Sequence, residues 1–340
     1  MANRILIIKP SSLGDVATTL PMLCDLRRAY PDAKIDWLIH PSLTALLQGH
    51  DAINDLILFD RKKLASWWYK PSALSLFRKL LKQLRAARYD LVIDAQGLFR
   101  SGFLARYTGA KTRIGFATAR EGATLFYTHK VPLPNRGKTM LAVDRMRALL
   151  APLHIDTTTP AQFRLPVQVT QHSAFRIPNS FVAIIPGARW NTKRWDIERY
   201  IEITRKLLAD GQHVLLLGSP DEKPLCDQIQ AAAPAATNLA GQTTLAQMIA
   251  LLDRASLILG NDSGPLHVAV ALGKPIVAIY GPTSPDFVGP YGQLQNVLRH
   301  DVPCHPCRLR ECDHHSCMKG VPVELVWEKM KQVSNPPTKV

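Results

Sequence analysis

The chain has 340 residues, of which 46% are hydrophobic and 20% are charged, so two domains with sizeable cores can form. No segment is apolar for the roughly 18 residues that a membrane-spanning helix needs. The apolar stretch near the N-terminus is short and is followed by a lysine, unlike a signal peptide. These features exclude a helical membrane protein and lead us to expect a soluble protein of the cytoplasm.

Most of the net charge of +15 is carried by the first half of the chain. Residues 1–165 contain 25 Lys and Arg against 12 Asp and Glu, whereas residues 166–340 contain 17 against 15. A basic half of this kind favours an anionic partner, either a nucleic acid, an acidic membrane surface or a phosphorylated substrate. We do not expect nucleic acid, because no zinc-finger, RNP or helix-turn-helix pattern is present. A solvated basic face without a partner is the alternative.

The first predicted element is a buried parallel strand over Arg4–Ile8, and the phrase after it is the most informative of the chain. A Ser-Ser-x-Gly turn leads to Asp15, and an apolar helix is expected over Val16–Ala29. Asp15 therefore stands where a strand ends and a helix starts, which is where open α/β sheets build their sites. Two roles suit it, a helix cap or a functional carboxylate.

Short β-rich runs alternate with helical stretches through the rest of the first half, which predicts a parallel sheet with crossover helices. The stretch Ala73–Ala87 has leucines at helical spacing and basic residues mostly on the opposite face, so we expect a surface helix. The further strand candidates are Lys34–Ile39, Asp55–Phe59, Asp90–Asp94, Arg113–Gly115 and Thr128–Val131.

Residues 157–179 turn polar and contain three prolines, which predicts a linker between domains. A second α/β series follows it. Its predicted strands are Phe181–Ile185, His213–Leu217, Ser256–Leu259 and Pro275–Ile279, and its predicted helices are Ile197–Ala209, Glu222–Ala232, Thr244–Leu252, Pro265–Ala271 and Pro322–Gln332. We therefore expect two doubly wound, Rossmann-like α/β domains facing a cleft. They span residues 1–165 and 166–320, and residues 321–340 form a C-terminal helix that packs back on the body.

Two phrases in the second series follow predicted strands and carry groups suited to a diphosphate. In Pro186–Trp195, Lys193 and its neighbouring arginines supply donors that match phosphate oxygens. In Gly260–His267, a turn of small residues leads into a helix, so the amides of Ser263, Gly264 and Leu266 can hold an anion.

Four residues near these phrases have two readings each. Asp262 would repel a bare phosphate, so it suits a sugar hydroxyl or a helix cap better. His267 lies one turn into its helix and either contacts the diphosphate or is structural. Glu222 either accepts hydrogen bonds from a ribose diol or balances a helix N-terminus. Thr283 follows another strand and either binds phosphate or shapes a turn.

Polar and basic residues at strand ends of the first half are candidates for contact with an anionic acceptor. For each one alone, a solvent-exposed role is the simpler interpretation, but as a set they account for part of the excess charge. The candidates are Ser12, Arg61, Lys62, Gln96, Arg100, Arg113 and Arg120.

Four of the six cysteines form a cluster with the spacing Cys304-x2-Cys307-x4-Cys312-x4-Cys317, with three histidines among them. In a cytoplasmic chain such a cluster suggests metal before disulfides. The spacing is not that of a zinc ribbon, however, so reduced thiols or a redox-labile loop are favoured over structural zinc. We expect no metal in the site and no cofactor.

Together these phrases resemble the ADP-heptose:lipopolysaccharide heptosyltransferases of glycosyltransferase family 9 over nearly the whole chain. The resemblance rests on Lys9–Asp15, Asp94–Gly97, Ala119–Glu121, Pro186–Lys193, Asp262–His267 and Tyr280–Thr283. It implies a GT-B fold and an inverting, metal-independent transfer, with an acceptor domain in the first half and an ADP-heptose donor domain in the second.

The resemblance also implies roles for particular residues. Asp15 matches the general base, Lys193 and Asp262–His267 match the segment that holds the donor, and Glu222 matches the residue that meets the adenosine ribose. Gly14 is counted with the donor residues. The phrases at Asp94–Gly97 and 119–122 are more similar to heptosyltransferase I than II. This implies Kdo on lipid A, an anionic lipopolysaccharide precursor, as acceptor, with peripheral contact at the cytoplasmic face of the inner membrane.

Three alternatives stay open from the sequence. The first is a heptosyltransferase of type II or III, which would act on a core heptose. The second is another sugar-nucleotide enzyme on the same fold, such as a hydrolysing epimerase. The third is a non-catalytic protein that binds anionic lipid or nucleic acid through the basic half.

Overall fold

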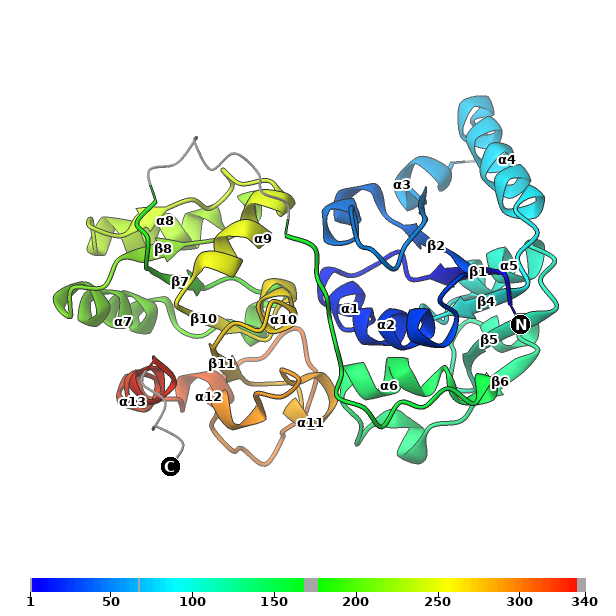
Figure 1. Ribbon diagram of the computed structural model, residues 1–340. Coiled ribbons are helices and arrows are strands. Elements are labelled where there is room, and N and C mark those ends of the chain that lie inside the picture. Colours follow the sequence, from blue (N-terminus) through cyan, green and yellow to red (C-terminus); the bar gives the residue numbers. More distant parts are fainter. Residues whose placement is uncertain (1, 67, 168–176, 335–340) are drawn as a thin grey trace. The chain divides into compact units, whose positions relative to one another are not determined.

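The computed structural model describes residues 2–66, 68–167 and 177–334. It divides into two units, Met1–Pro166 and Val167–Val340, and each unit is a parallel sheet covered by helices (Figure 1). Of the predicted linker over 157–179, residues 168–176 lie outside the described residues.

Unit 1 contains a parallel six-stranded sheet in the order β3-β2-β1-β4-β5-β6. The central strands β1 and β4 are buried almost throughout, as their unbroken apolar sequences require. The winding of the chain reverses between β1 and β4, so this is the topological switch point. The strands are β1 (Arg4–Ile8), β2 (Lys34–Ile39), β3 (Asp55–Leu58), β4 (Leu91–Asp94), β5 (Thr112–Phe116) and β6 (His129–Val131).

The helix expected over Val16–Ala29 is in fact two helices, which corrects that prediction. Thr18 and Thr19 separate them, and the Oγ1 of each donates to the Asp15 carbonyl, at 3.2 and 2.6 Å. The physical reason is Pro21, which has no amide for the carbonyl four residues earlier and suits the first turn of a new helix. The helices of unit 1 are α1 (Leu13–Ala17), α2 (Leu20–Ala29), α3 (Arg61–Leu64), α4 (Pro71–Ala86), α5 (Phe99–Tyr107) and α6 (Ala142–Ala148).

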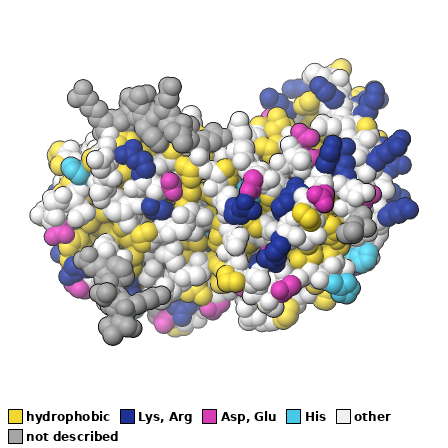
Figure 2. Space-filling model, in the orientation of Figure 1, with side chains coloured by type: hydrophobic (Ala, Val, Ile, Leu, Met, Phe, Trp, Pro, Cys, Tyr) yellow, Lys and Arg dark blue, Asp and Glu magenta, His cyan; other side chains and the backbone are white. Residues whose placement is uncertain are grey.

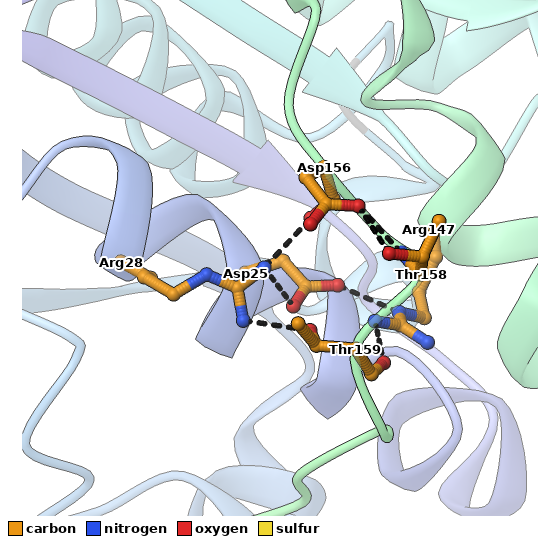
Figure 3. A network of polar contacts seen from close by, with 6 residues as sticks. All are labelled: Asp25, Arg28, Arg147, Asp156, Thr158 and Thr159. Carbon is orange, nitrogen blue, oxygen red and sulfur yellow. Dashed lines mark hydrogen bonds and ion pairs between the residues drawn. The ribbon is translucent and has the colours of Figure 1, made fainter.

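A buried polar network ties α6 to α2 and to the start of the predicted linker (Figure 3). Arg147 donates its Nε to Asp25 Oδ2 at 2.6 Å and its Nη2 to the Thr159 carbonyl at 2.7 Å. Both side chains of the Arg147–Asp25 pair are 5% exposed. Arg28 lies 3.0 Å from the other Asp25 oxygen and donates to the Asp156 carbonyl at 2.6 Å.

Replacing Arg147 with methionine is expected to lower the free energy of unfolding by about 2–3 kcal/mol, because charge-assisted hydrogen bonds are lost in a buried setting. Asp25 keeps Arg28 as a partner, which limits the loss. Urea denaturation measures the effect. The matched control is Arg106→Met, an exposed arginine on α5, with an expected change below about 0.5 kcal/mol. Equal losses in the two variants would contradict the buried role of Arg147.

Unit 2 repeats the same winding, with strand order β12-β11-β10-β7-β8-β9 and its switch point between β7 and β10. The strands are β7 (Val182–Ile185), β8 (Val214–Leu216), β9 (Thr237–Asn238), β10 (Leu257–Asn261), β11 (Ile276–Tyr280) and β12 (Val297–Arg299). The helices are α7 (Ile197–Ala209), α8 (Lys223–Ala232), α9 (Leu245–Arg254), α10 (Gly264–Ala271), α11 (Pro285–Val288), α12 (Ser316–Lys319) and α13 (Val323–Ser334). Short 3₁₀ turns connect several elements, including η6 (Asn191–Lys193) and η7 (Pro220–Glu222). The last helix, α13, buries Val323, Val326 and Met330 in the core of this unit.

The predicted doubly wound α/β architecture is confirmed, and every predicted strand is present to within two residues at each end. Two strands were missed, β9 and β12. They have two and three residues and lie at the edges of the sheet, where too few residues are buried to produce a hydrophobic pattern. No helix within the described ranges has the length and apolar character needed to cross a bilayer.

Candidate active site

The switch point of unit 2 gathers three predicted site residues around the carboxylate of a fourth, Asp262. Lys193 Nζ lies 2.6 Å from Asp262 Oδ2, and Thr283 Oγ1 donates to the same oxygen at 2.6 Å. His267 Nε2 lies 3.8 Å from Asp262 Oδ1. These residues come from η6, the β10–α10 turn, α10 and the end of β11, so the cluster joins three neighbouring loops.

Asp262 is held ionised in this cluster although its side chain is only 6% exposed. Burial favours the neutral form, but the nearby His267 imidazole and the charge of Lys193 outweigh it and lower the pKa of Asp262 to about 2. The carboxylate is thus balanced within the protein. Its repulsion of a phosphate, which we expected from the sequence, is correspondingly reduced. Asp262 also does not cap α10, because Ser263 occupies the N-cap position.

The Asp262→Asn variant should differ from the wild type in a pH-dependent way. Because the folded-state pKa is depressed, the stability that this carboxylate contributes is present above its unfolded pKa and is lost as pH falls through about 2. This contribution is about 2 kcal/mol at pH 7 and roughly half of that at pH 3. Urea unfolding of both proteins at the two pH values measures it.

The control for this experiment is Asp32→Asn, which changes an exposed aspartate of unit 1. For the control, the free energy of unfolding should change by less than about 0.5 kcal/mol, as is usual for an exposed surface position. A stability difference for Asp262→Asn that does not shrink at pH 3 would contradict the ionised, paired state.

The N-terminus of α10 lies directly beside this cluster. Ser263 is its N-cap residue, and the Ser263 Oγ is buried without a hydrogen-bond partner among the described residues. Pro265 has no amide, so the first turn presents the amides of Gly264 and Leu266 to an incoming group. Unbonded amides at the positive end of a helix favour an anionic ligand, as predicted from the sequence.

Asn261 fixes the two loops of this switch point to each other, a role that our sequence analysis missed. Its Nδ2 donates to the Pro186 carbonyl at 2.8 Å, and its Oδ1 accepts from the Trp195 amide at 3.2 Å and the Tyr200 hydroxyl at 3.0 Å. The signal was present in the sequence, because Asn261 is a polar residue at the end of a predicted buried strand.

Glu222 lies in η7 and takes part in a capping box. Its Oε2 accepts from the Ser219 amide at 2.8 Å and the Ser219 hydroxyl at 2.9 Å. A Cβ atom at Gly187 would clash with Glu222 Oε1, so a larger residue there would displace the Glu222 side chain. The helix-capping reading of Glu222 is therefore realised, and ribose binding stays a prediction.

The cysteine-rich segment packs on the loops of this site. His315 Nε2 lies 2.8 Å from the Thr192 carbonyl, and the Thr192 hydroxyl donates to the Leu309 carbonyl at 2.8 Å. His305 Nε2 lies 3.2 Å from the Thr283 carbonyl. The segment therefore holds the residue next to Lys193 and the backbone of Thr283 in place.

All six cysteines are free thiols, and Cys317 is buried. Its burial raises the pKa of the Cys317 thiol, with the neighbouring cysteines of the segment adding to the shift. A Cβ atom at Gly281 would clash with the adjacent Met318, so this end of the segment fits closely on the end of β11. Among the described residues, no three His, Cys, Asp or Glu side chains meet as a metal site.

The switch point of unit 1 holds Asp15, which is exposed and is the third residue of α1. Asp15 Oδ2 accepts from the Ser12 amide at 3.0 Å and from the Ser12 hydroxyl at 2.7 Å. Ser12 is the N-cap residue, so Asp15 occupies the reciprocal position of the capping box, not the cap itself. The amide and hydroxyl of Ser12 orient the carboxylate.

A hollow of about 160 Å³ lies beside this turn and brings together three of the predicted acceptor residues. Arg61, Gln96 and Arg100 line it, together with Ser11 and His40. The Gln96 Oε1 is buried and has no hydrogen-bond partner among the described residues, so it is available to a ligand. The hollow therefore combines two cations with an unused amide oxygen.

Below this hollow, the buried Asp94 shapes the turn after β4. It accepts from the amides of Gln96 and Gly97 at 3.0 and 3.1 Å and from the Tyr127 hydroxyl at 2.6 Å. Burial raises the pKa of the Asp94 carboxyl, and these hydrogen bonds oppose the rise. Asp94 is therefore a positioning residue for Gln96.

The remaining predicted residues do not line the hollow. Lys62 is exposed on α3. Arg120 is exposed in a loop, and its backbone amide donates to the Gly97 carbonyl at 2.9 Å. Arg113 donates from Nε to the Phe126 carbonyl at 2.7 Å, so part of its guanidinium serves the fold. Gly14 is buried within α1 of unit 1. The roles of these four residues in ligand binding stay predictions.

With this geometry in place, the chain was compared with known proteins. The sequence model of "Glycosyltransferase family 9 (heptosyltransferase)" matches residues 77–317. The chain belongs to this family. The match includes Gln96, Lys193 and the Asp262–His267 phrase, and it resolves the epimerase and binding-protein alternatives in favour of a glycosyltransferase.

Curated relatives cover almost the whole chain. Lipopolysaccharide heptosyltransferase 1 of Pseudomonas aeruginosa is 31% identical and aligns over 92% of this chain and 88% of its own length. Heptosyltransferase 3 of Escherichia coli is 30% identical and aligns over 82% of this chain and 83% of its own length. Heptosyltransferase 2 of Escherichia coli K12 is 28% identical and aligns over 96% of this chain and 97% of its own length. The chain is therefore a lipopolysaccharide core heptosyltransferase, and these identities do not separate the core steps.

The solved structures agree on the fold. "E. coli heptosyltransferase WaaC with ADP-2-deoxy-2-fluoro heptose" superposes with a TM-score of 0.78 at 26% identity, covering 97% of this chain and 99% of that one. This match confirms the predicted GT-B fold of two Rossmann-like units.

Proposed function

We propose that this heptosyltransferase transfers heptose from ADP-heptose to the Kdo of a lipid A precursor. The transfer inverts the anomeric carbon, needs no metal, and takes place at the cytoplasmic face of the inner membrane. The observation that carries the proposal is that each switch point holds one half of the required chemistry. Unit 2 presents an anion site at Lys193 and α10, and unit 1 presents the oriented carboxylate of Asp15.

The donor's diphosphate is assigned to the N-terminus of α10. The amides of Gly264 and Leu266, the Ser263 hydroxyl and the ammonium of Lys193 are all hydrogen-bond donors suited to phosphate oxygens. Asp262 keeps that ammonium in position, and Thr283 and His267 contact the same carboxylate. The relative solved with ADP-2-deoxy-2-fluoro heptose supports ADP as the nucleotide.

The reaction follows as a single displacement. Asp15 takes the proton of the acceptor hydroxyl while the oxygen attacks the anomeric carbon of the heptose. The bond from that carbon to the diphosphate oxygen breaks, and ADP leaves with the electron pair. Lys193 and the α10 amides stabilise the negative charge that develops on the leaving oxygen, which is the task that a metal performs in other transferases.

The acceptor is assigned to the hollow beside Asp15. Kdo carries a carboxylate and lipid A carries phosphates, and both match the guanidinium groups of Arg61 and Arg100. The phrases at Asp94–Gly97 and 119–122 favour the Kdo step over the later heptose steps.

The test is incubation with ADP-heptose and three acceptors that carry no, one or two core heptoses, followed by mass spectrometry. The proposal expects one heptose to be added to the heptose-free Kdo-lipid A acceptor and none to the others. Addition only to an acceptor that already carries heptose would assign the chain to type II or III. UDP-heptose serves as the control donor, and its use in place of ADP-heptose would contradict the proposed donor.

A further inference from the structure

Residues 61–66 and 68–88, which contain α3 and α4 and are called the α3–α4 segment below, form the most basic part of the described chain. They include nine Lys and Arg and no Asp or Glu. In Figure 2, Lys and Arg side chains gather over the end of unit 1 where Figure 1 shows α4. A surface with this charge attracts anions over a range set by the Debye length, about 10 Å at 0.1 M salt.

Aromatic side chains stand among these cations and are exposed to solvent. Trp68 is 73% exposed and Tyr69 is 57% exposed, and their rings pack edge to face with centroids 4.6 Å apart. Lys70 lies 5.7 Å from the Tyr69 ring centroid, and Leu76 on α4 is 42% exposed. A basic face that only keeps a protein soluble has no need of these apolar groups, whereas the headgroup region of a bilayer favours Trp and Tyr.

The helix α4 holds part of this charge in a fixed place. Leu80 and Leu84 are buried in the core of unit 1, while Lys79 and Lys82 are exposed on the other face. Arg61, at the start of the segment, lines the hollow assigned to the acceptor. The α3–α4 segment therefore contains both a residue that lines the acceptor hollow and the exposed aromatic residues.

We propose that the α3–α4 segment docks this protein on an anionic phospholipid bilayer. Trp68 and Tyr69 enter the headgroup region, and the cations of α3 and α4 lie over the headgroup phosphates. The biological role of this docking rests on the proposed function, because docking would let a lipid-anchored acceptor reach the hollow from the adjacent membrane. It is tested without acceptor, so it can fail while heptose transfer stands.

Binding of the full chain to acceptor-free vesicles tests the proposal. Co-sedimentation at 0.1 M salt compares phosphatidylglycerol with phosphatidylcholine vesicles. Each cation near an anionic surface contributes about fivefold to binding, so Lys79→Gln with Lys82→Gln should weaken binding to phosphatidylglycerol by about 25-fold. Trp68→Ala with Tyr69→Ala should weaken it by about tenfold. The control pair, Lys111→Gln with Lys130→Gln, removes the same charge from exposed positions of unit 1 outside the segment.

Support requires binding to phosphatidylglycerol but not phosphatidylcholine, losses in both segment variants and wild-type binding in the control pair. Unchanged circular dichroism and unchanged transfer to a detergent-dispersed acceptor show that the segment variants are folded. Wild-type vesicle binding by the segment variants would overturn the proposal, and so would an equal loss in the control pair. Binding to a 20-nucleotide RNA without binding to vesicles would overturn it in favour of a nucleic-acid partner.

Discussion

The Asp15→Asn variant is expected to transfer heptose about 10²–10⁴-fold more slowly than the wild type, since it lacks the base that takes the acceptor proton. Asparagine has nearly the same shape as aspartate, and its side-chain oxygen can still accept from Ser12. The fold and the donor site in unit 2 should therefore be unaffected. Single-turnover transfer measured by mass spectrometry gives the rate, and calorimetry gives the dissociation constant for ADP.

The Asp32→Asn variant is the matched control, because it removes the same charge from an exposed site in the same unit. We expect it to transfer heptose at the wild-type rate. If Asp15→Asn also kept that rate, Asp15 would serve only the capping box of α1. A large loss of ADP affinity in Asp15→Asn would instead indicate a donor-binding role.

The Lys193→Met variant is expected to lose about 10²–10³-fold in transfer rate, the usual effect of removing one donor that stabilises charge in a transition state. Its ADP dissociation constant should rise at least about tenfold, because a charge-assisted hydrogen bond is lost. Lys206→Met on α7 is the control, since that lysine is surface-exposed and pairs with a neighbouring glutamate. It should change neither quantity by more than about twofold.

Lys193→Met also leaves the buried Asp262 carboxylate without its cation, so lost stability has to be separated from lost chemistry. The double variant Lys193→Met with Asp262→Asn removes the unpaired charge. Its unfolding free energy should recover relative to Lys193→Met, while its transfer stays slow. Recovery of transfer together with stability would show that Lys193 acts only as a structural partner of Asp262.

Much of the fold could be predicted from the sequence, because the informative polar phrases directly follow buried strands. β1, β4, β7 and β10 are unbroken apolar runs, and the polar phrases after them stand at the two switch points by the topology of a doubly wound sheet. Lys193, Asp262 and His267 were each identified from such a phrase, and Thr283 from the phrase after β11. That they share one carboxylate depends on contacts across three loops, which no local pattern encodes.

Three features of the structure were not predicted from the sequence, namely the break in the first helix, the contacts of Arg113 and the contacts of the cysteine-rich segment. Pro21 split the helix that the apolar pattern had joined. The guanidinium of Arg113 bonds to backbone carbonyls near its own strand, which its position in a basic region did not reveal. The cysteine-rich segment was judged by metal-ligand spacing, whereas its observed contacts with the site are made by His305, His315 and Leu309.

The anomeric configuration of the transferred heptose distinguishes a single displacement from a reaction in two displacement steps. One base on the acceptor and a charge-stabilised leaving group produce a single displacement, which inverts the anomeric carbon. Nuclear magnetic resonance of the isolated product, compared with the donor, measures this configuration. We expect inversion. Retention would require a second nucleophilic step and would contradict a reaction driven by Asp15 and Lys193.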